Sequence, residues 1–166
     1  MKFMAVCFDL DGTLLDTLED LADSMNAALA RRGFDIHPVE AYRTFIGDGV
    51  DMLVARTAPQ SRDDAKLHAE LIEDVRREYA DRWANKTRPY DGVGEMLNGL
   101  AKRRLKMAVL SNKPHDFTKL CVEKLLANWS FDVVQGVCDG VPKKPDPAGA
   151  LRIAERLGVP PAEFLY

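Results

Sequence analysis

The stretch Val6-Cys7-Phe8-Asp9-Leu10-Asp11-Gly12-Thr13-Leu14 decides the fold and directs the search for a function. An apolar run from Phe3 to Phe8 predicts a β-strand, and two carboxylates follow it. Because side chains alternate in direction along a strand, Asp9 and Asp11 would share a face if the strand continued. Gly12 is expected to end the strand, since glycine permits a sharp turn. Two carboxylates that point into one space repel each other unless a cation or a proton lies between them, and Mg²⁺ suits such oxygen ligands.

An ordinary structural explanation also exists for this pair. Aspartate is common in turns, so a lone Asp-x-Asp would be interpreted as a strand end and a turn. Here the pair follows an apolar strand, and Gly12-Thr13 comes next, with backbone N–H groups that can bind an anion. This combination favours a chemical role.

The run Asp9-Leu10-Asp11-Gly12-Thr13-Leu14 resembles the first motif of the haloacid dehalogenase-like hydrolase superfamily. The resemblance implies that Asp9 is a nucleophile that takes the phosphoryl group as an aspartyl-phosphate. It implies that Asp11 is a general acid and base that protonates the leaving oxygen. Dehalogenases of the superfamily generally lack the second aspartate, so Asp11 indicates phosphate chemistry.

Composition narrows the class of protein. A chain of 166 residues suits one domain, or a small domain with an insertion. The net charge of -3 gives no reason to expect nucleic acid or an anionic membrane as a partner. No apolar segment approaches the ~20 residues that a membrane span needs, and the N-terminus does not resemble a signal peptide. Three widely spaced cysteines suggest reduced thiols and a cytoplasmic protein. The sequence leaves the oligomeric state open, and a homo-oligomer is one possibility.

The order of predicted elements indicates an α/β fold. We expect a Rossmann-like parallel sheet as the core, residues 1–16 and 89–166, with a helical cap inserted at residues 17–88. Apolar periodicity predicts cap helices over 17–33, 38–46 and 50–57, and one long helix over 61–83. In the core, strands are predicted at 105–110, 131–134 and from 164, and helices at 93–101, 114–126 and 147–157.

Polar residues follow the predicted strands, where ligands gather in open parallel sheets. Ser111 and Asn112 either cap the helix that starts near Pro114 or bind phosphate oxygens at its N-terminus. Lys143-Lys144 is either a solvated pair of charges or a source of a cation for a phosphate.

The resemblance separates these alternatives, because Ser111 and Lys144 fall where the superfamily has its second and third motifs. It implies that Ser111 hydrogen-bonds the phosphoryl group, with Asn112, Gly12 and Thr13 as further substrate-binding residues. It implies that Lys144 steadies Asp9 and the phosphoryl charge.

The cap loop Ile46-Gly47-Asp48-Gly49-Val50 is similar to that of the phosphoglycolate phosphatases, and it makes Gly47 a further candidate for substrate binding.

The C-terminus departs from the superfamily pattern. A fourth motif, Gly-Asp with further acidic residues, is expected after the next strand, but the sequence stops at Tyr166. We therefore expect the last core strands to be missing and the strand before Asp9 to be bare on one side. Only Asp9 and the backbone carbonyl of Asp11 would then bind Mg²⁺, and they would bind it weakly.

Three hypotheses result. The first is a magnesium-dependent phosphomonoester hydrolase that acts on small phosphorylated metabolites, with 2-phosphoglycolate as the favoured substrate. The second is a related mutase, pyrophosphatase or phosphonatase; a phosphonatase needs a cap lysine, for which Lys66 and Lys86 are the candidates. The third is a non-catalytic fragment without the last metal-binding motif.

Overall fold

The protein is described by a computed structural model, which covers residues 3–166 in detail. The chain forms two compact units. Unit 1 comprises Met1–Leu15 and Pro89–Tyr166, and unit 2 comprises Asp16–Arg88. The boundary falls within two short strands, β2 (Leu15–Asp16) and β3 (Arg88–Pro89), which pair with each other.

Unit 1 is built on a four-stranded parallel sheet in the order β5-β4-β1-β6. These strands are β1 (Ala5–Phe8), β4 (Lys106–Pro114), β5 (Val133–Val137) and β6 (Phe164–Leu165). In the register, Ala5 pairs with Lys106 and Ala108 pairs with Val133. The predicted α/β class with a parallel core sheet is confirmed.

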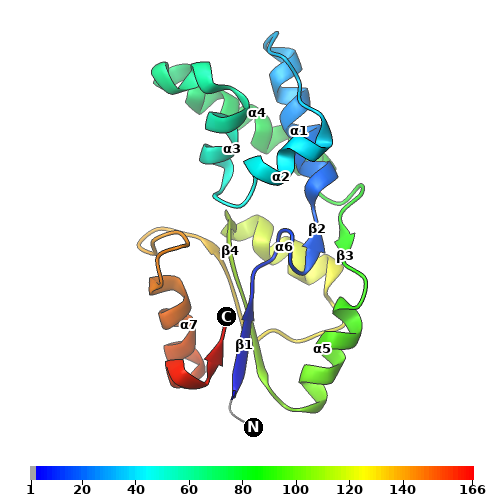
Figure 1. Cartoon of the computed structure of the whole chain (residues 1–166), viewed down its shortest axis with the longest axis vertical. Coiled ribbons are helices and arrows are strands. Elements are labelled where there is room, and N and C mark those ends of the chain that lie inside the picture. The colour runs from blue at the N-terminus through cyan, green and yellow to red at the C-terminus, as the bar shows by residue number, and fades with distance from the viewer. Residues whose placement is uncertain (1–2) are drawn as a thin grey trace. The chain divides into compact units, whose positions relative to one another are not determined.

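Helices cover both faces of this sheet. Helix α7 (Ala148–Leu157) lies on one side, and α5 (Val93–Lys102) and α6 (His115–Leu125) lie on the other (Figure 1). All four residues of β1 are buried, as expected for a strand between two helical layers. The face towards α7 carries a core cluster of Ala5, Cys7, Ala108, Leu110, Val133, Ile153, Leu157 and Val159.

Unit 2 is helical, and no strand occurs within residues 18–87. Its helices are α1 (Leu18–Arg31), α2 (Tyr42–Phe45), α3 (Val50–Thr57) and α4 (Ala65–Arg82), with 3₁₀ helices at Val39–Ala41 and Pro59–Asp63. Their apolar faces share a core of Leu18, Ala22, Met25, Ala28, Leu29, Tyr42, Leu53, Val54, Ala58, Leu71 and Val75.

A buried carboxylate joins the two ends of unit 2. Asp20, on α1, is 1% exposed. It accepts hydrogen bonds from the N–H groups of Lys86 and Thr87 and from the Thr87 hydroxyl. Because a buried carboxylate is costly unless its oxygens are paired, these bonds hold the last residues of unit 2 on its first helix.

Two predicted elements were wrong in their limits. The single helix expected over 61–83 is divided, because the Asp64 side chain accepts from the N–H groups of Lys66 and Leu67 and so starts α4. The strand expected over 105–110 continues to Pro114, because Pro114 still pairs with Val137 after a shift in register.

The alternative in which Ser111 or Asn112 caps the next helix is also wrong, since Pro114 is the N-cap.

The edge of the sheet also differs from expectation. The strand predicted from residue 164 does pair with β1, through Ala5–Phe164 and Val6–Leu165. The β1 strand is therefore covered over its first two residues, and the expectation of a bare strand was wrong for that part.

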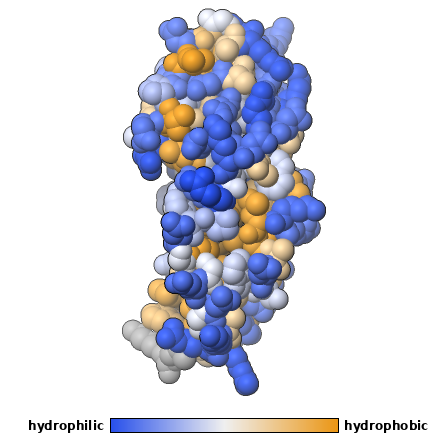
Figure 2. Space-filling model, turned by 90° about the vertical axis from the view of Figure 1, so that its right-hand side faces the viewer, coloured by the Kyte–Doolittle hydropathy of each residue, from blue (hydrophilic) through white to orange (hydrophobic). Residues whose placement is uncertain are grey.

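Hydrophilic residues dominate the face shown in Figure 2, where hydrophobic residues form only small separate patches. Scattered apolar residues are normal for a protein surface. Among the described helices, none combines the length and the apolar character that a membrane span requires.

Gly136, on β5, marks a very close approach of backbone segments in unit 1. A Cβ atom there would lie 2.5 Å from the Lys113 carbonyl oxygen and 2.7 Å from the Cα of His115. It would also lie 2.4 Å from the Thr118 hydroxyl. Only glycine allows the segment between β4 and α6 to pack this closely on β5.

We therefore predict that Gly136→Ala destabilises the protein by about 1–3 kcal/mol, the usual cost of overpacking. Thermal unfolding measures this loss. Gly99→Ala is the matched control, because nothing lies within 4 Å of a Cβ at that position in α5. The control should leave the protein as stable or make it slightly more stable, since alanine favours helix. An equal Tm for Gly136→Ala and the wild type would contradict the packing argument.

Candidate active site

Asp9 follows the last residue of β1, and its side chain is held at one oxygen. Its Oδ1 accepts a hydrogen bond from the Leu10 N–H at 2.7 Å and lies 2.8 Å from Lys144 Nζ. Its Oδ2 makes no hydrogen bond to the described residues. A carboxylate with one oxygen anchored and one oxygen available can act as a nucleophile or as a metal ligand.

Asp11 lies in a tight turn rather than in a continued strand. Gly12 has a φ of 77° in this turn, a conformation that favours glycine. The N–H groups of Gly12 and Thr13 donate to the carbonyl oxygens of Leu15 and Leu10. These N–H groups therefore serve the turn in this structure, and the substrate contact expected for Gly12 and Thr13 stays a prediction.

Lys113, at the end of β4, pairs with Asp11. Its Nζ lies 2.8 Å from Asp11 Oδ1, and the side chains are 5% and 16% exposed. Each of the two aspartates thus has its own lysine, which offsets the repulsion expected between neighbouring carboxylates.

Asn112 connects β4 to the loop that carries Lys144. Its side-chain amide donates to the Lys144 carbonyl oxygen at 3.0 Å and accepts from the Lys144 N–H at 2.9 Å. Asn112 therefore fixes the backbone of Lys144, and the substrate contact expected for it stays a prediction.

Ser111 lies one residue earlier on β4. Its hydroxyl oxygen accepts the Lys113 N–H at 3.1 Å. A hydroxyl can accept and donate at once, so its proton can still be donated to an anion.

Lys144 has a second neighbour in Tyr166. Its ammonium lies 5.6 Å from the centre of the Tyr166 ring. Burial, the largest effect, disfavours the ammonium form, but hydrogen bonds to Asp9 and Tyr166 together outweigh it and raise the pKa of Lys144. Lys144 is therefore a permanent cation beside Asp9 over the physiological pH range.

Gly47 belongs to unit 2, in the loop between α2 and α3, and has a φ of 113°. Asp48 of the same loop pairs with Arg56 on α3, and Arg56 also donates to the Phe45 carbonyl oxygen. The loop is thus braced by its own helix. The substrate contact expected for Gly47 stays a prediction.

A Ser-His-Asp chain of hydrogen bonds in unit 2 has no counterpart in the sequence analysis. His68 Nδ1 lies 3.0 Å from the Ser61 hydroxyl, and His68 Nε2 lies 3.1 Å from Asp51 Oδ1. A nucleophilic serine must be reached by its substrate, whereas Ser61 is fully buried. The chain of bonds therefore braces the helices of unit 2.

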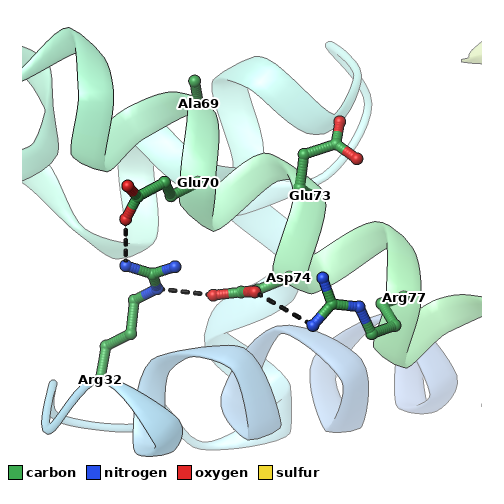
Figure 3. Close-up of a pocket in the computed structure, with 6 residues that line it drawn as sticks. All are labelled: Arg32, Ala69, Glu70, Glu73, Asp74 and Arg77. Carbon is green, nitrogen blue, oxygen red and sulfur yellow. Dashed lines mark hydrogen bonds and ion pairs between the residues drawn. The ribbon is translucent and has the colours of Figure 1, made fainter.

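Unit 2 also has a pocket between α1 and α4, shown in Figure 3. Arg32 lies in it, 2.7 Å from Glu70 and 2.5 Å from Asp74. Arg77 lies 3.7 Å from the same Asp74. Because the two cations are already paired with these acids, the pocket is a salt-bridge network rather than a site for an anion.

The described residues contain no group of three or more His, Cys, Asp or Glu side chains that could hold a metal. Mg²⁺ accepts few protein ligands when it keeps several waters. The Asp9 carboxylate and the Asp11 carbonyl oxygen fit a site of that kind.

Comparison with known proteins assigns the family. A model of the haloacid dehalogenase-like hydrolases matches residues 6–166, so the chain belongs to this family. A phosphoglycolate phosphatase of Thiobacillus denitrificans is 37% identical over 99% of this chain and 74% of its own length. A phosphoglycolate phosphatase of Pseudomonas savastanoi is 34% identical over 97% of this chain, which spans 60% of that relative.

A solved structure supports the same fold. The crystal structure of a predicted phosphoglycolate phosphatase from Haemophilus somnus is 26% identical, with a TM-score of 0.90. The match covers 99% of this chain and 76% of that one.

Sequence reasoning singled out Asp9, Asp11, Ser111 and Lys144, and the structure pairs two of these directly, Asp9 and Lys144. It missed Lys113 and Tyr166. The continuous apolar run of β4 held no signal for Lys113, whose partner lies 102 residues away in the sequence.

The cysteines provide a test of the burial described for unit 1. Burial raises the pKa of Cys121 to about 11 and that of Cys7 to about 12, whereas Cys138 is exposed. Alkylation follows the thiolate fraction, so at pH 8 we expect iodoacetamide to modify Cys138 first by a wide margin. Mass spectrometry of the native protein measures this order, and labelling in denaturant controls for intrinsic reactivity. Rapid native labelling of Cys121 would contradict the packing of α6.

Proposed function

We propose that this chain is a magnesium-dependent phosphomonoester hydrolase that acts through an aspartyl-phosphate on Asp9, with small phosphorylated metabolites such as 2-phosphoglycolate as substrates. The observation that carries the proposal is the pairing of Asp9 with Lys144 beside the pairing of Asp11 with Lys113. Family membership and the similarity to phosphoglycolate phosphatases support it.

The first chemical step takes place at Asp9. Its Oδ2 attacks phosphorus while Oδ1 stays bound to the Leu10 N–H and to Lys144. A bond forms between Oδ2 and phosphorus, and the bond from phosphorus to the ester oxygen breaks. Asp11, which starts this step with a proton on Oδ2, gives that proton to the leaving oxygen, so the alcohol leaves in neutral form.

The second step reverses the roles at Asp11. Water attacks the phosphorus of the aspartyl-phosphate and passes a proton to Asp11, and the bond between phosphorus and Asp9 breaks. Inorganic phosphate leaves, and both carboxylates return to their first state.

Charge neutralisation accounts for most of the catalysis in this proposal. Lys144 lies beside Asp9 and balances the phosphoryl oxygens, and the Ser111 hydroxyl donates to one of them. Mg²⁺, held by Asp9 and the Asp11 carbonyl, would supply further positive charge to the phosphoryl group. We propose that unit 2 acts as a cap that selects the organic part of the substrate. We also propose that the protein is cytoplasmic, because its three cysteines are free thiols.

The phosphonatase alternative is disfavoured by the lysines of unit 2. Lys86 lies 2.9 Å from Asp23 and 3.1 Å from Glu19, and hydrogen bonds to these acids raise the pKa of Lys86. A Schiff base needs a neutral amine, so Lys86 is poorly suited to that role. Lys66 is exposed on the surface of α4.

We predict that the protein releases phosphate from small phosphomonoesters and that Asp9→Asn lowers kcat by at least about 1,000-fold, as expected for loss of a nucleophile. A phosphate-release assay with 2-phosphoglycolate and with glycerol phosphate measures this. Asp139→Asn, at an exposed position, is the matched control. Equal release by Asp9→Asn and the wild type would refute the nucleophile assignment.

Removal of the metal provides a separate prediction. Because only two protein oxygens are assigned to Mg²⁺, we expect EDTA to abolish phosphate release and millimolar Mg²⁺ to restore it. Titration of activity with Mg²⁺ measures the affinity. Full activity in EDTA would rule out the metal part of the proposal.

A further inference from the structure

We infer that Lys113 is a positioning residue that fixes one oxygen of Asp11 and leaves the other directed to the leaving group. The inference rests on the proposed function, in which Asp11 carries the proton. It adds a residue that neither the sequence motifs nor the comparisons assign.

The ion pair of Lys113 and Asp11 is largely buried, and the contact between its charged atoms is short. Lys113 Nζ lies 2.8 Å from Asp11 Oδ1, and the lysine side chain is 5% exposed. A buried ammonium strongly favours a charged acceptor, and loss of either partner leaves an uncompensated charge. The pair therefore determines where the Asp11 carboxylate lies.

The backbone of Lys113 is itself held from three sides. The Ser111 hydroxyl accepts its N–H at 3.1 Å. The Thr118 hydroxyl lies 3.3 Å from its carbonyl oxygen and 3.0 Å from that of Pro114, and it shares its proton between them. Gly136 packs against the same carbonyl so closely that no Cβ would fit. A side chain on such a fixed backbone has little freedom to release its partner, which is what precise positioning requires.

Only one oxygen of Asp11 is used in this contact. Oδ2 makes no hydrogen bond with any residue from 3 to 166, so it is the atom that can give a proton to the ester oxygen and later take one from water. Lys113 thus acts on the reaction through Asp11, whereas Lys144 contacts the nucleophile.

Two substrates with different leaving groups distinguish a positioning role of Lys113 from a purely structural one. An alkyl phosphate needs its leaving oxygen protonated, whereas p-nitrophenolate leaves without a proton. We expect Lys113→Met to lower kcat for glycerol phosphate about 100-fold, the scale of general acid catalysis, and kcat for p-nitrophenyl phosphate by less than about fivefold. Lys113→Arg should recover part of the loss. Lys119→Met, an exposed lysine on α6, is the matched control.

Other results would overturn the inference. Equal losses with both substrates would make Lys113 a structural residue. A rise in KM and in the inhibition constant of inorganic phosphate, with kcat unchanged, would make it a direct phosphate ligand. Unchanged kinetics would remove it from the site.

A double-mutant cycle tests the pair without any assay of activity. We expect the Tm losses of Lys113→Met and Asp11→Asn to be strongly non-additive, because each single variant removes the same buried ion pair. Additive losses would overturn the inference even if the enzyme is active. Absence of phosphate release by the wild type would instead overturn the proposed function, while the cycle would still decide whether Lys113 fixes Asp11.

Discussion

Two carboxylates next to one another at the end of a buried strand must each be neutralised, and unit 1 meets this requirement with two lysines. Lys144 reaches Asp9 from the loop after β5, and Lys113 reaches Asp11 from the end of β4. Parallel strands bring their carboxyl ends to one edge of the sheet, so segments far apart in the sequence can supply these cations. The sheet order β5-β4-β1 is thus the framework on which the charge balance depends.

The fold could be predicted where the pattern is local. The apolar run before Asp9 predicts β1, and the helix over 50–57 agrees with α3 (Val50–Thr57). Prediction failed where a contact between residues far apart in the sequence decided where a strand ends. The extension of β4 to Pro114 depends on its pairing with Val137, which no local pattern shows. The start of α4 could have been predicted, since Asp64 is a good N-cap. The apolar periodicity over 61–83 was given more weight than this capping signal.

The site was predictable to the extent that chemistry follows strand ends. Asp9 was found because a carboxylate pair after an apolar strand indicates chemistry, and Lys144 was found because its place matches the third motif of the superfamily that the sequence resembles. The two side chains lie in contact. The backbone contacts of Asn112, Gly12 and Thr13 could not be found in this way. Each of these contacts joins residues that no local pattern links, and only coordinates show them.

The two ion pairs differ in how far they are exposed to solvent, and the difference suits the two chemical roles proposed for them. The side chains of Asp9 and Lys144 are 36% and 17% exposed, whereas those of Asp11 and Lys113 are 16% and 5% exposed. A nucleophile must be open to an incoming phosphoryl group. A proton carrier gains from being shielded, since electrostatic contacts strengthen as water is excluded. Exchange of these environments would leave the proposed attacking oxygen covered and the proposed proton carrier exposed to bulk water, so the proposed mechanism requires the pairs in their present places.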